Sequence, residues 1–226
     1  MKHYTLTDIK NELIRKYNDN EFTINANGVK TVEIIDANFE VAKDETAIFG
    51  ELNEYASREL VWYNSQSLNV YDIPGKVPLI WKRVADNYGY INSNYGWCIY
   101  NPANSNQYIN CLKHLKSDPG TRQACMIYNR PSMQYEYNRD GMSDFMCTFA
   151  VQVFIRNNIL YYNVLMRSND AVYGFKNDLY WHRHVINQLI DDLKKSDINI
   201  DDYKLYWHAG SLHLYESNFN FINGDK

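Results

Sequence analysis

The order of its periodic segments constrains the fold of this chain more than any other feature, because helical patterns come mostly first and strand patterns cluster later. Helical spacing of apolar residues predicts a first helix opened by a capping box at Thr5-Leu6-Thr7-Asp8, and further helices over 51–64, 78–87, 105–116 and 179–193. Strand-forming runs cover 31–41, 124–130, 149–156, 159–167 and 205–215. Helices and strands that are segregated rather than alternating favour an α+β fold.

Two of the strand runs are separated only by Asn157-Asn158, a pair that tolerates positive φ and predicts a β-hairpin. The chain of 226 residues contains no internal repeat, low-complexity segment or linker. We therefore expect a single domain over residues 1–226.

Composition narrows the classes of function. No apolar run approaches a membrane span and the N-terminus lacks a secretory pattern, so we expect a cytoplasmic protein with reduced cysteines. The net charge is −4 and there is no Lys/Arg block, which disfavours direct binding to a nucleic-acid polymer. The four cysteines show no CxxC spacing, and no histidine has a second ligand at metal-binding spacing. The sequence therefore predicts no metal site.

Glu59 is the residue whose position alone is most informative. It falls near the middle of an apolar helical stripe formed by Leu52, Tyr55, Ala56, Leu60 and Tyr63. A carboxylate on a buried face is costly unless it is paired or serves acid/base chemistry with a raised pKa. The alternative is a purely structural role, in which Glu59 forms a buried ion pair with Arg58 or Arg83.

Cys147 stands at the entry to a predicted strand, in Ser143-Asp144-Phe145-Met146-Cys147-Thr148. Side chains at strand ends are available to ligands, although a cysteine is often only a small buried hydrophobe. Cys98, Cys111 and Cys125 lie in apolar periodic runs and are interpreted as packing residues.

Two polar segments flank the last predicted helix. Arg167-Ser168-Asn169-Asp170 ends a strand, and Asp178 precedes the helix, where it could act merely as a cap. In Ser211-Leu212-His213-Leu214-Tyr215, alternation places His213 and Tyr215 on one face. That face could bind a sugar, or could be a solvent-exposed surface without a ligand.

Seven blocks in order resemble the thymidylate synthase superfamily over most of the chain. They are Arg58-Glu59-Leu60-Val61-Trp62-Tyr63, Ile80-Trp81, Asn94-Tyr95-Gly96, Cys147 with Gln152, Arg167-Ser168-Asn169-Asp170, Gly174 with Asp178, and His213-Leu214-Tyr215. INSNYGW, MIYNRPSMQYEYNRDGMSDFMCT and MRSNDAVYGFKND resemble the phage deoxycytidylate hydroxymethylases of this superfamily more closely than the synthases.

The resemblance implies a thymidylate synthase-like fold, with helices packed on a mixed β-sheet and a homodimer formed through the sheet. It implies transfer of a one-carbon unit from 5,10-methylenetetrahydrofolate to C5 of dCMP with addition of water, without a metal. The products are 5-hydroxymethyl-dCMP and tetrahydrofolate. A phage-encoded enzyme of this kind would act in the cytoplasm of the host cell.

The resemblance also implies roles for individual residues. Cys147 matches the nucleophile that adds to pyrimidine C6, Glu59 the carboxylate that manages protons and water, and Tyr95 a member of the proton network. Further matches concern ligands: Arg167 and Ser168 for phosphate, Arg122 for phosphate from the partner subunit, His213 and Tyr215 for the 3′-hydroxyl, Trp81 and Asp170 for folate, and Gln152 for the nucleotide.

The resemblance places Asp178 where synthases have an asparagine that reads uracil. A carboxylate accepts from the 4-amino group of cytosine, and a proton on Asp178 or on N3 completes a second hydrogen bond. An ionised carboxylate facing uracil O4 would be repelled. Gln123 replaces the family's second phosphate arginine, and Thr148 replaces the histidine after the nucleophile.

Other functions stay open at this point. The enzyme could hydroxymethylate CMP or dUMP, or methylate its nucleotide as the synthases do. A catalytically inactive nucleotide-binding or dimeric structural protein would keep the arginines but lose Cys147 or Glu59, and both are present. A Cys–His hydrolase needs a histidine beside Cys147, which the sequence cannot place.

Overall fold

A computed structural model describes residues 4–24 and 28–223 of the chain. Its helices are α1 (Leu6–Asn18), α2 (Glu54–Ser65), α3 (Leu79–Val84), α4 (Tyr95–Tyr100), α5 (Gln107–Ser117), α6 (Met133–Glu136) and α7 (Gly174–Lys194). Its strands are β1 (Tyr4–Thr5), β2 (Phe22–Ile24), β3 (Lys30–Val41), β4 (Cys125–Ile127), β5 (Thr148–Arg156), β6 (Ile159–Asp170) and β7 (Asp202–Tyr215). Four short 3-10 turns, η1 (Val70–Asp72), η2 (Pro102–Asn104), η3 (Arg139–Gly141) and η4 (Glu216–Phe221), complete the described elements.

The strands form one mixed sheet in the order β1-β3-β7-β6-β5-β4, with β2 paired to β3. Most neighbours are antiparallel, but the short β1 is parallel to β3, and β6 and β7 are parallel and are joined through α7. Parallel neighbours need such a crossover, because a tight turn can join only antiparallel strands. The α+β fold expected from the sequence, with helices packed on a mixed sheet, is therefore present.

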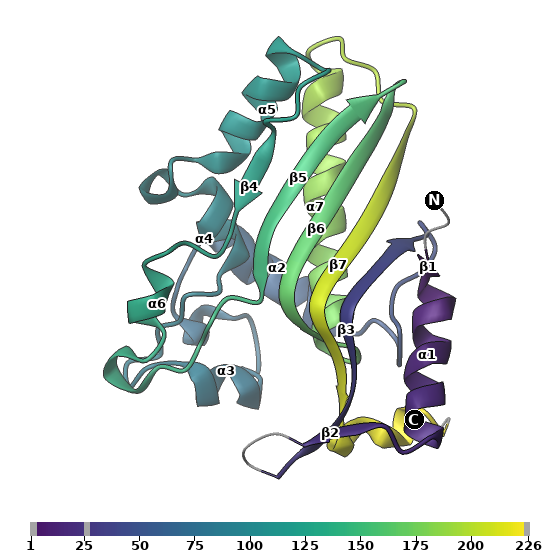
Figure 1. Ribbon diagram of the computed structural model, residues 1–226. Coiled ribbons are helices and arrows are strands. Elements are labelled where there is room, and N and C mark those ends of the chain that lie inside the picture. Colours follow the sequence, from purple (N-terminus) through teal and green to yellow (C-terminus); the bar gives the residue numbers. More distant parts are fainter. Residues whose placement is uncertain (1–3, 25–27, 224–226) are drawn as a thin grey trace.

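Helices cover one face of the sheet. Helix α7 lies behind β5, β6 and β7 in Figure 1, and α2 and α5 pack against α7. Along β5, buried residues such as Val151 and Val153 alternate with partly exposed ones such as Gln152. Alternation of this kind means that one face of the strand contacts the core while the other lacks a helical cover.

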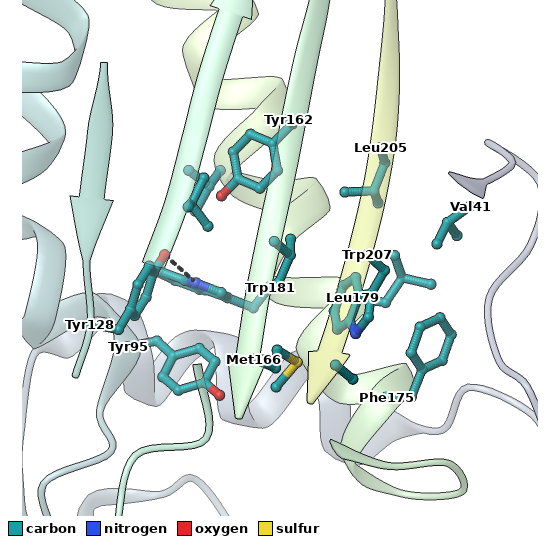
Figure 2. Packing of buried hydrophobic residues seen from close by; sticks show 14 of the residues in the cluster. Val41, Tyr95, Tyr128, Tyr162, Met166, Phe175, Leu179, Trp181, Leu205 and Trp207 are labelled. Carbon is teal, nitrogen blue, oxygen red and sulfur yellow. Dashed lines mark hydrogen bonds between the residues drawn. The ribbon is translucent and has the colours of Figure 1, made fainter. Parts of the chain in front are cut away.

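The core between α7 and the sheet is rich in aromatic side chains. Trp62, Trp181 and Trp207 are fully buried, and such residues contribute a large share of the apolar area removed from water. Figure 2 shows the indole nitrogen of Trp181 pointing at the hydroxyl of Tyr128, to which it donates over 3.1 Å. In the same view the hydroxyl of Tyr95 points away from that bond. The packing thus fixes the orientation of Tyr95 at the edge of the core.

Two local predictions are confirmed in detail. Thr5 caps α1 and exchanges hydrogen bonds with Asp8, as the capping-box pattern predicts. The β5–β6 connection is a two-residue turn in which Asn157 and Asn158 have φ of 52° and 59°. Asparagine tolerates this left-handed backbone better than other residues with a Cβ.

Several predicted boundaries are wrong. The helix expected over 78–87 covers only Leu79–Val84. Pro78 is its N-cap and lies outside the helix, because its backbone is extended, with a ψ of 145°. The strand expected over 124–130 pairs only at Cys125–Ile127, and Cys125 is exposed rather than a packing residue.

No helix in residues 4–24 and 28–223 is long and apolar enough to cross a membrane.

Candidate active site

Cys147 lies immediately before β5, beside Arg167 of the neighbouring strand β6. The backbone N–H of Arg167 donates to the carbonyl oxygen of Cys147 over 2.8 Å. Nη2 of Arg167 lies 3.7 Å from Sγ of Cys147. The guanidinium also donates to the carbonyl oxygens of Phe145 and Met146, at 2.7 and 2.9 Å. The backbone around the thiol therefore holds Arg167 in place.

The thiol of Cys147 is protonated at neutral pH. Burial raises its pKa to about 11, and the charge of Arg167 opposes this rise. Burial raises the pKa of Cys98 and of Cys111 to about 12. Both of those residues are buried in the core, as expected for packing residues, whereas Cys147 keeps partial exposure. Of these three thiols, a ligand in the site could reach only Cys147.

Glu59 is buried in α2, with only 5% of its surface exposed. Its Oε1 accepts a hydrogen bond from the hydroxyl of Tyr55 at 2.5 Å and from Nε1 of Trp81 at 3.2 Å. Burial raises the pKa of Glu59 to about 7, and these hydrogen bonds limit the rise. Glu59 can therefore gain or lose a proton near neutral pH.

The ion pair considered for Glu59 from the sequence is wrong. Arg58 donates to the carbonyl oxygen of Lys76 at 2.5 Å and lies over the ring of Tyr55. Arg83 is exposed on α3. Within the described ranges, no ion pair includes Glu59. Its carboxyl is held by neutral donors, an environment that suits proton transfer better than a fixed charge.

Asp178 lies in the second turn of α7, which begins at Gly174 with Tyr173 as the N-cap. The interpretation of Asp178 as a helix cap is therefore wrong. Its Oδ2 accepts from the side-chain amide of Asn169 at 2.8 Å. Burial raises the pKa of Asp178 to about 8, and the nearby charge of Glu59 raises it further. At neutral pH this carboxyl is mostly protonated.

Tyr95 connects the start of β5 to Asp178. It is buried at the N-terminus of α4, where its hydroxyl accepts from Oγ1 of Thr148 at 2.9 Å and donates to Asp178. Burial raises the pKa of Tyr95 well above its usual value, and the charges of Asp178 and Cys147 add to the rise. Tyr95 therefore stays a neutral hydrogen-bond donor.

The mutual influence of these groups on their pKa values shows that they form one cluster. Glu59 raises the pKa of Asp178, and Asp178 and Cys147 raise the pKa of Tyr95. The pKa of Cys147 is raised by Asp178 and lowered by Arg167. A thiol beside two carboxyls of raised pKa can combine nucleophilic attack with proton transfer near pH 7. In the described part of the chain, no three His, Cys, Asp or Glu side chains converge as metal ligands would.

The ends of β6 and β7 carry the remaining polar residues of this cluster. In the register of the two strands Ser168 pairs with Ser211 and Asp170 with His213. The rings of His213 and Tyr215 lie 4.7 Å apart in an edge-to-face arrangement. Burial lowers the pKa of His213, with Asp170 opposing, so the ring is neutral at physiological pH.

The carboxylate of Asp170 has a local structural task. It accepts hydrogen bonds from the backbone N–H groups of Val172, Tyr173 and Gly174, at 3.2, 2.9 and 3.2 Å. Two of these donors, Tyr173 at the N-cap and Gly174 at the first position of α7, are ones that a helix start leaves unsatisfied, so Asp170 stabilises the beginning of α7. A direct contact of its side chain with folate stays a prediction.

Arg122 and Gln152 lie outside this cluster. Gln152 is five residues beyond Cys147, about 16 Å along an extended strand. It projects from the sheet face that lacks a helical cover, and its amide donates to the carbonyl oxygen of Arg122 at 3.0 Å. The side chain of Arg122 is exposed. Within one chain neither residue joins the Cys147 site, and a role toward another subunit stays a prediction.

Three residues of the cluster were not expected from the sequence as functional. Tyr55 stands four residues before Glu59 on α2, a spacing that puts both side chains on one helix face and could have revealed the pair. Asn169 lies inside a block already singled out, but its contact with Asp178 spans a strand-to-helix turn. Thr148 was noted only as a replacement, and its bond to Tyr95 depends on tertiary structure.

Comparison with known proteins shows the family of the chain. The family model described as thymidylate synthase matches residues 14–224. The chain is 48% identical over 223 residues, 97% of its length, to the deoxycytidylate 5-hydroxymethyltransferases of Enterobacteria phages T4 and T6, and covers 89% of each. It is 23% identical over 175 residues to a thymidylate synthase of Francisella tularensis subsp. holarctica, covering 73% of this chain and 62% of that one.

A comparison with solved structures shows the fold. The crystal structure of thymidylate synthase from T4 phage superimposes with a TM-score of 0.71 and 19% identity, covering 94% of this chain and 77% of the other. The family model covers most of the chain, and the phage proteins share nearly half of its residues. The chain belongs to the thymidylate synthase family.

Proposed function

We propose that this protein transfers a one-carbon unit from 5,10-methylenetetrahydrofolate to C5 of dCMP, with addition of water. The products are 5-hydroxymethyl-dCMP and tetrahydrofolate. Members of the family use methylenetetrahydrofolate as co-substrate. The relatives that share 48% identity over nearly the whole chain are named for hydroxymethyl transfer to deoxycytidylate. The single observation that carries the choice of base is Asp178, a buried carboxyl with a pKa of about 8 next to Cys147 and Glu59.

In this proposal Cys147 adds through sulfur to C6 of the pyrimidine. The addition makes C5 nucleophilic, so that C5 bonds to the methylene carbon of the folate. Loss of the C5 proton and departure of tetrahydrofolate leave an exocyclic methylene, to which water adds, and release of the C6–S bond completes the cycle. Arg167, 3.7 Å from Sγ, stabilises the thiolate that forms.

Glu59 is proposed to exchange protons with the base and to orient the water. Its pKa of about 7 makes it both a proton donor and an acceptor at working pH. Trp81 contributes an indole that reaches Glu59 and Tyr55, so folate stacked on Trp81 would lie directly beside the proton-transfer group. Tyr95, which donates to Asp178, is proposed to take part in the same proton transfer.

Asp178 is proposed to read the 4-amino edge of cytosine. Asn169 donates to Oδ2, so that oxygen acts as an acceptor, and the ligand is expected at Oδ1. Cytosine offers an amino donor and the N3 acceptor, and a protonated Asp178, or a protonated N3 with an ionised Asp178, satisfies both. Uracil offers a donor and an acceptor in the reverse order, so an ionised Asp178 would repel its O4.

The nucleotide's other groups are assigned to the residues at the strand ends. Arg167 and Ser168 are proposed to bind the phosphate, with Arg122 reaching in from the partner of a homodimer and Gln152 contributing from the same face. His213 and Tyr215 are proposed to bind the 3′-hydroxyl, and Asp170 to border the folate. The uncovered face of the sheet supports the dimer, because it carries a hollow of about 650 Å³ lined by aromatic residues, among them Phe154, Tyr161 and Tyr206.

The test is to incubate the protein with methylenetetrahydrofolate and dCMP, dUMP or CMP, and to identify each product by mass. The proposal expects 5-hydroxymethyl-dCMP as the main product. Dihydrofolate together with a methylated nucleotide would show a synthase-type reduction instead. Faster turnover of CMP or dUMP than of dCMP would overturn the choice of substrate while leaving the chemistry intact.

A further inference from the structure

Three polar side chains form a line across strands β3 and β7, ending at His213. In the register of these strands Glu33 lies directly opposite His213. Ser211 precedes His213 by two residues, so the two side chains leave β7 on the same face. The roles proposed above assign no function to Glu33 or Ser211.

The direction of the hydrogen bonds follows from the chemistry of the groups. Ser211 Oγ donates to Glu33 Oε1 over 2.5 Å, because a carboxylate can only accept. A hydroxyl has one proton, so Ser211 Oγ can act only as an acceptor toward Nδ1 of His213, which lies 3.3 Å away. A neutral imidazole that carries its proton on Nδ1 has an unprotonated Nε2.

We propose that Glu33 is a positioning residue, which acts through Ser211 to hold His213 as the Nδ1–H tautomer, so that Nε2 accepts a hydrogen bond from a hydroxyl group of the bound sugar. The identity of that hydroxyl, the 3′-hydroxyl of dCMP, rests on the proposed function. The tautomer does not. The ring of His213 also hydrogen-bonds the backbone of Ser211, independently of Glu33. Without Glu33 the proton of Ser211 can turn toward Nδ1 and compete with the ring N–H, which shifts the ring toward the Nε2–H form.

The tautomer can be measured in the free protein. We would record long-range ¹H–¹⁵N correlation spectra of the histidine rings in the full-length protein, and assign His213 from the signals lost in His213→Gln. The chain contains six histidines, few enough for this assignment. A protonated Nδ1 and an unprotonated Nε2 at pH 7.5 are expected. The reverse pattern in the wild-type protein would overturn the proposal, even if no variant could be purified.

Variants separate positioning from folding. Glu33→Ala and Ser211→Ala should each move His213 toward the Nε2–H form, and Glu33→Gln, whose amide oxygen can still accept, should partly preserve the wild-type spectrum. Glu12→Ala is the control, because this exposed carboxylate pairs with Arg15 on the surface of α1. Unchanged His213 signals in both Glu33→Ala and Ser211→Ala would contradict the proposal.

Kinetics supply the second measurement. Loss of one well-directed hydrogen bond should raise KM for dCMP about fivefold in Glu33→Ala, with a smaller change in kcat. The preference of the enzyme for dCMP over 2′,3′-dideoxy-CMP should fall by the same factor. A merely structural role would lower activity toward both nucleotides equally. If the protein did not use dCMP at all, the proposed function would fail while the tautomer of His213 would still be decided by the spectrum.

Discussion

The side-chain amide of Asn169 donates a hydrogen bond of 2.8 Å to Oδ2 of Asp178. Asn169 is the penultimate residue of strand β6 and Asp178 lies in the second turn of α7, so the contact bridges the turn between them. Because the amide nitrogen of Asn169 can only donate, the group that faces it from position 178 must accept. This constraint fixes which way an amide side chain would point if it replaced the carboxyl.

Asp178→Asn should therefore reverse the preference for the base. Asn169 would hold the new amide oxygen in the position of Oδ2, which places the NH₂ group at the position of Oδ1, where the proposal expects the base. That group donates to O4 of uracil and cannot accept from the amino group of cytosine. The ratio of kcat/KM for dCMP to that for dUMP should fall by at least about 100-fold.

The matched control is Asp191→Asn, the same change at an exposed position of α7. Its ratio of dCMP to dUMP turnover should equal that of the wild-type protein. Since α7 begins at Gly174, the change at Asp178 does not remove a helix cap. An unchanged ratio in Asp178→Asn would remove the main physical support for a cytidylate substrate.

The preference for dCMP over dUMP should depend on pH. Burial raises the pKa of Asp178 to about 8, so below pH 8 the carboxyl is mostly neutral and its proton can also be donated to uracil O4. Above pH 8 it is ionised and repels O4, while it still accepts from the amino group of cytosine. Discrimination against dUMP should thus increase between pH 7 and 9. Competition between the two nucleotides at each pH measures this, and a flat profile in the wild-type protein would contradict it.

Glu59→Gln should slow turnover by about 10²- to 10⁴-fold with little change in nucleotide binding. The amide keeps the size of the side chain and can still meet Tyr55 and Trp81, but it cannot exchange a proton. Glu54→Gln, an exposed position on the same helix, is the control. Near-normal turnover of Glu59→Gln would mean that Glu59 only fills a buried polar position.

Much of the fold could be predicted because it depends on local patterns. The spacing of apolar residues along α1, α2, α5 and α7 and the alternation in β5–β7 report burial directly. The shortened strand β4 could not be predicted, since the N–H groups of Tyr128 and Asn129 both turn to the carbonyl oxygen of Phe149. Pairing of this kind depends on the partner strand β5 and cannot be predicted from residues 124–130 alone.

The candidate site divides in the same way. Glu59 was found from the sequence because a carboxylate inside an apolar stripe is costly, and the structure buries it. The contact of Asn169 with Asp178 and that of Thr148 with Tyr95 join residues from different elements, so no spacing rule indicates them. The helix-cap interpretation of Asp178 failed because α7 begins at Gly174, more than one turn before the predicted start at residue 179.

Gly96→Ala should destabilise the protein by about 3 kcal/mol or more. A Cβ at this position would lie 1.8 Å from the carbonyl oxygen of Tyr63, so α4 and α2 would have to move apart. Gly120→Ala is the control, because its added Cβ would meet only the side chain of Asp118, at 3.1 Å. Urea unfolding of both variants measures the difference, and equal midpoints would show that the helices separate easily.

Cys147→Ser should abolish turnover while nucleotide binding changes little. A serine hydroxyl ionises far less readily than a thiol, whose pKa of about 11 here is already high, and it is the weaker nucleophile toward C6. Phosphate and sugar contacts should persist, because they do not involve the sulfur.

Cys111→Ser is the control, since this thiol is buried in α5 with a pKa of about 12 and has no ligand to reach. It should keep activity within a few-fold of wild type at a temperature where it remains folded. Product formation by mass spectrometry and dCMP binding by calorimetry separate the two effects. Similar losses from both substitutions would argue against Cys147 as the nucleophile.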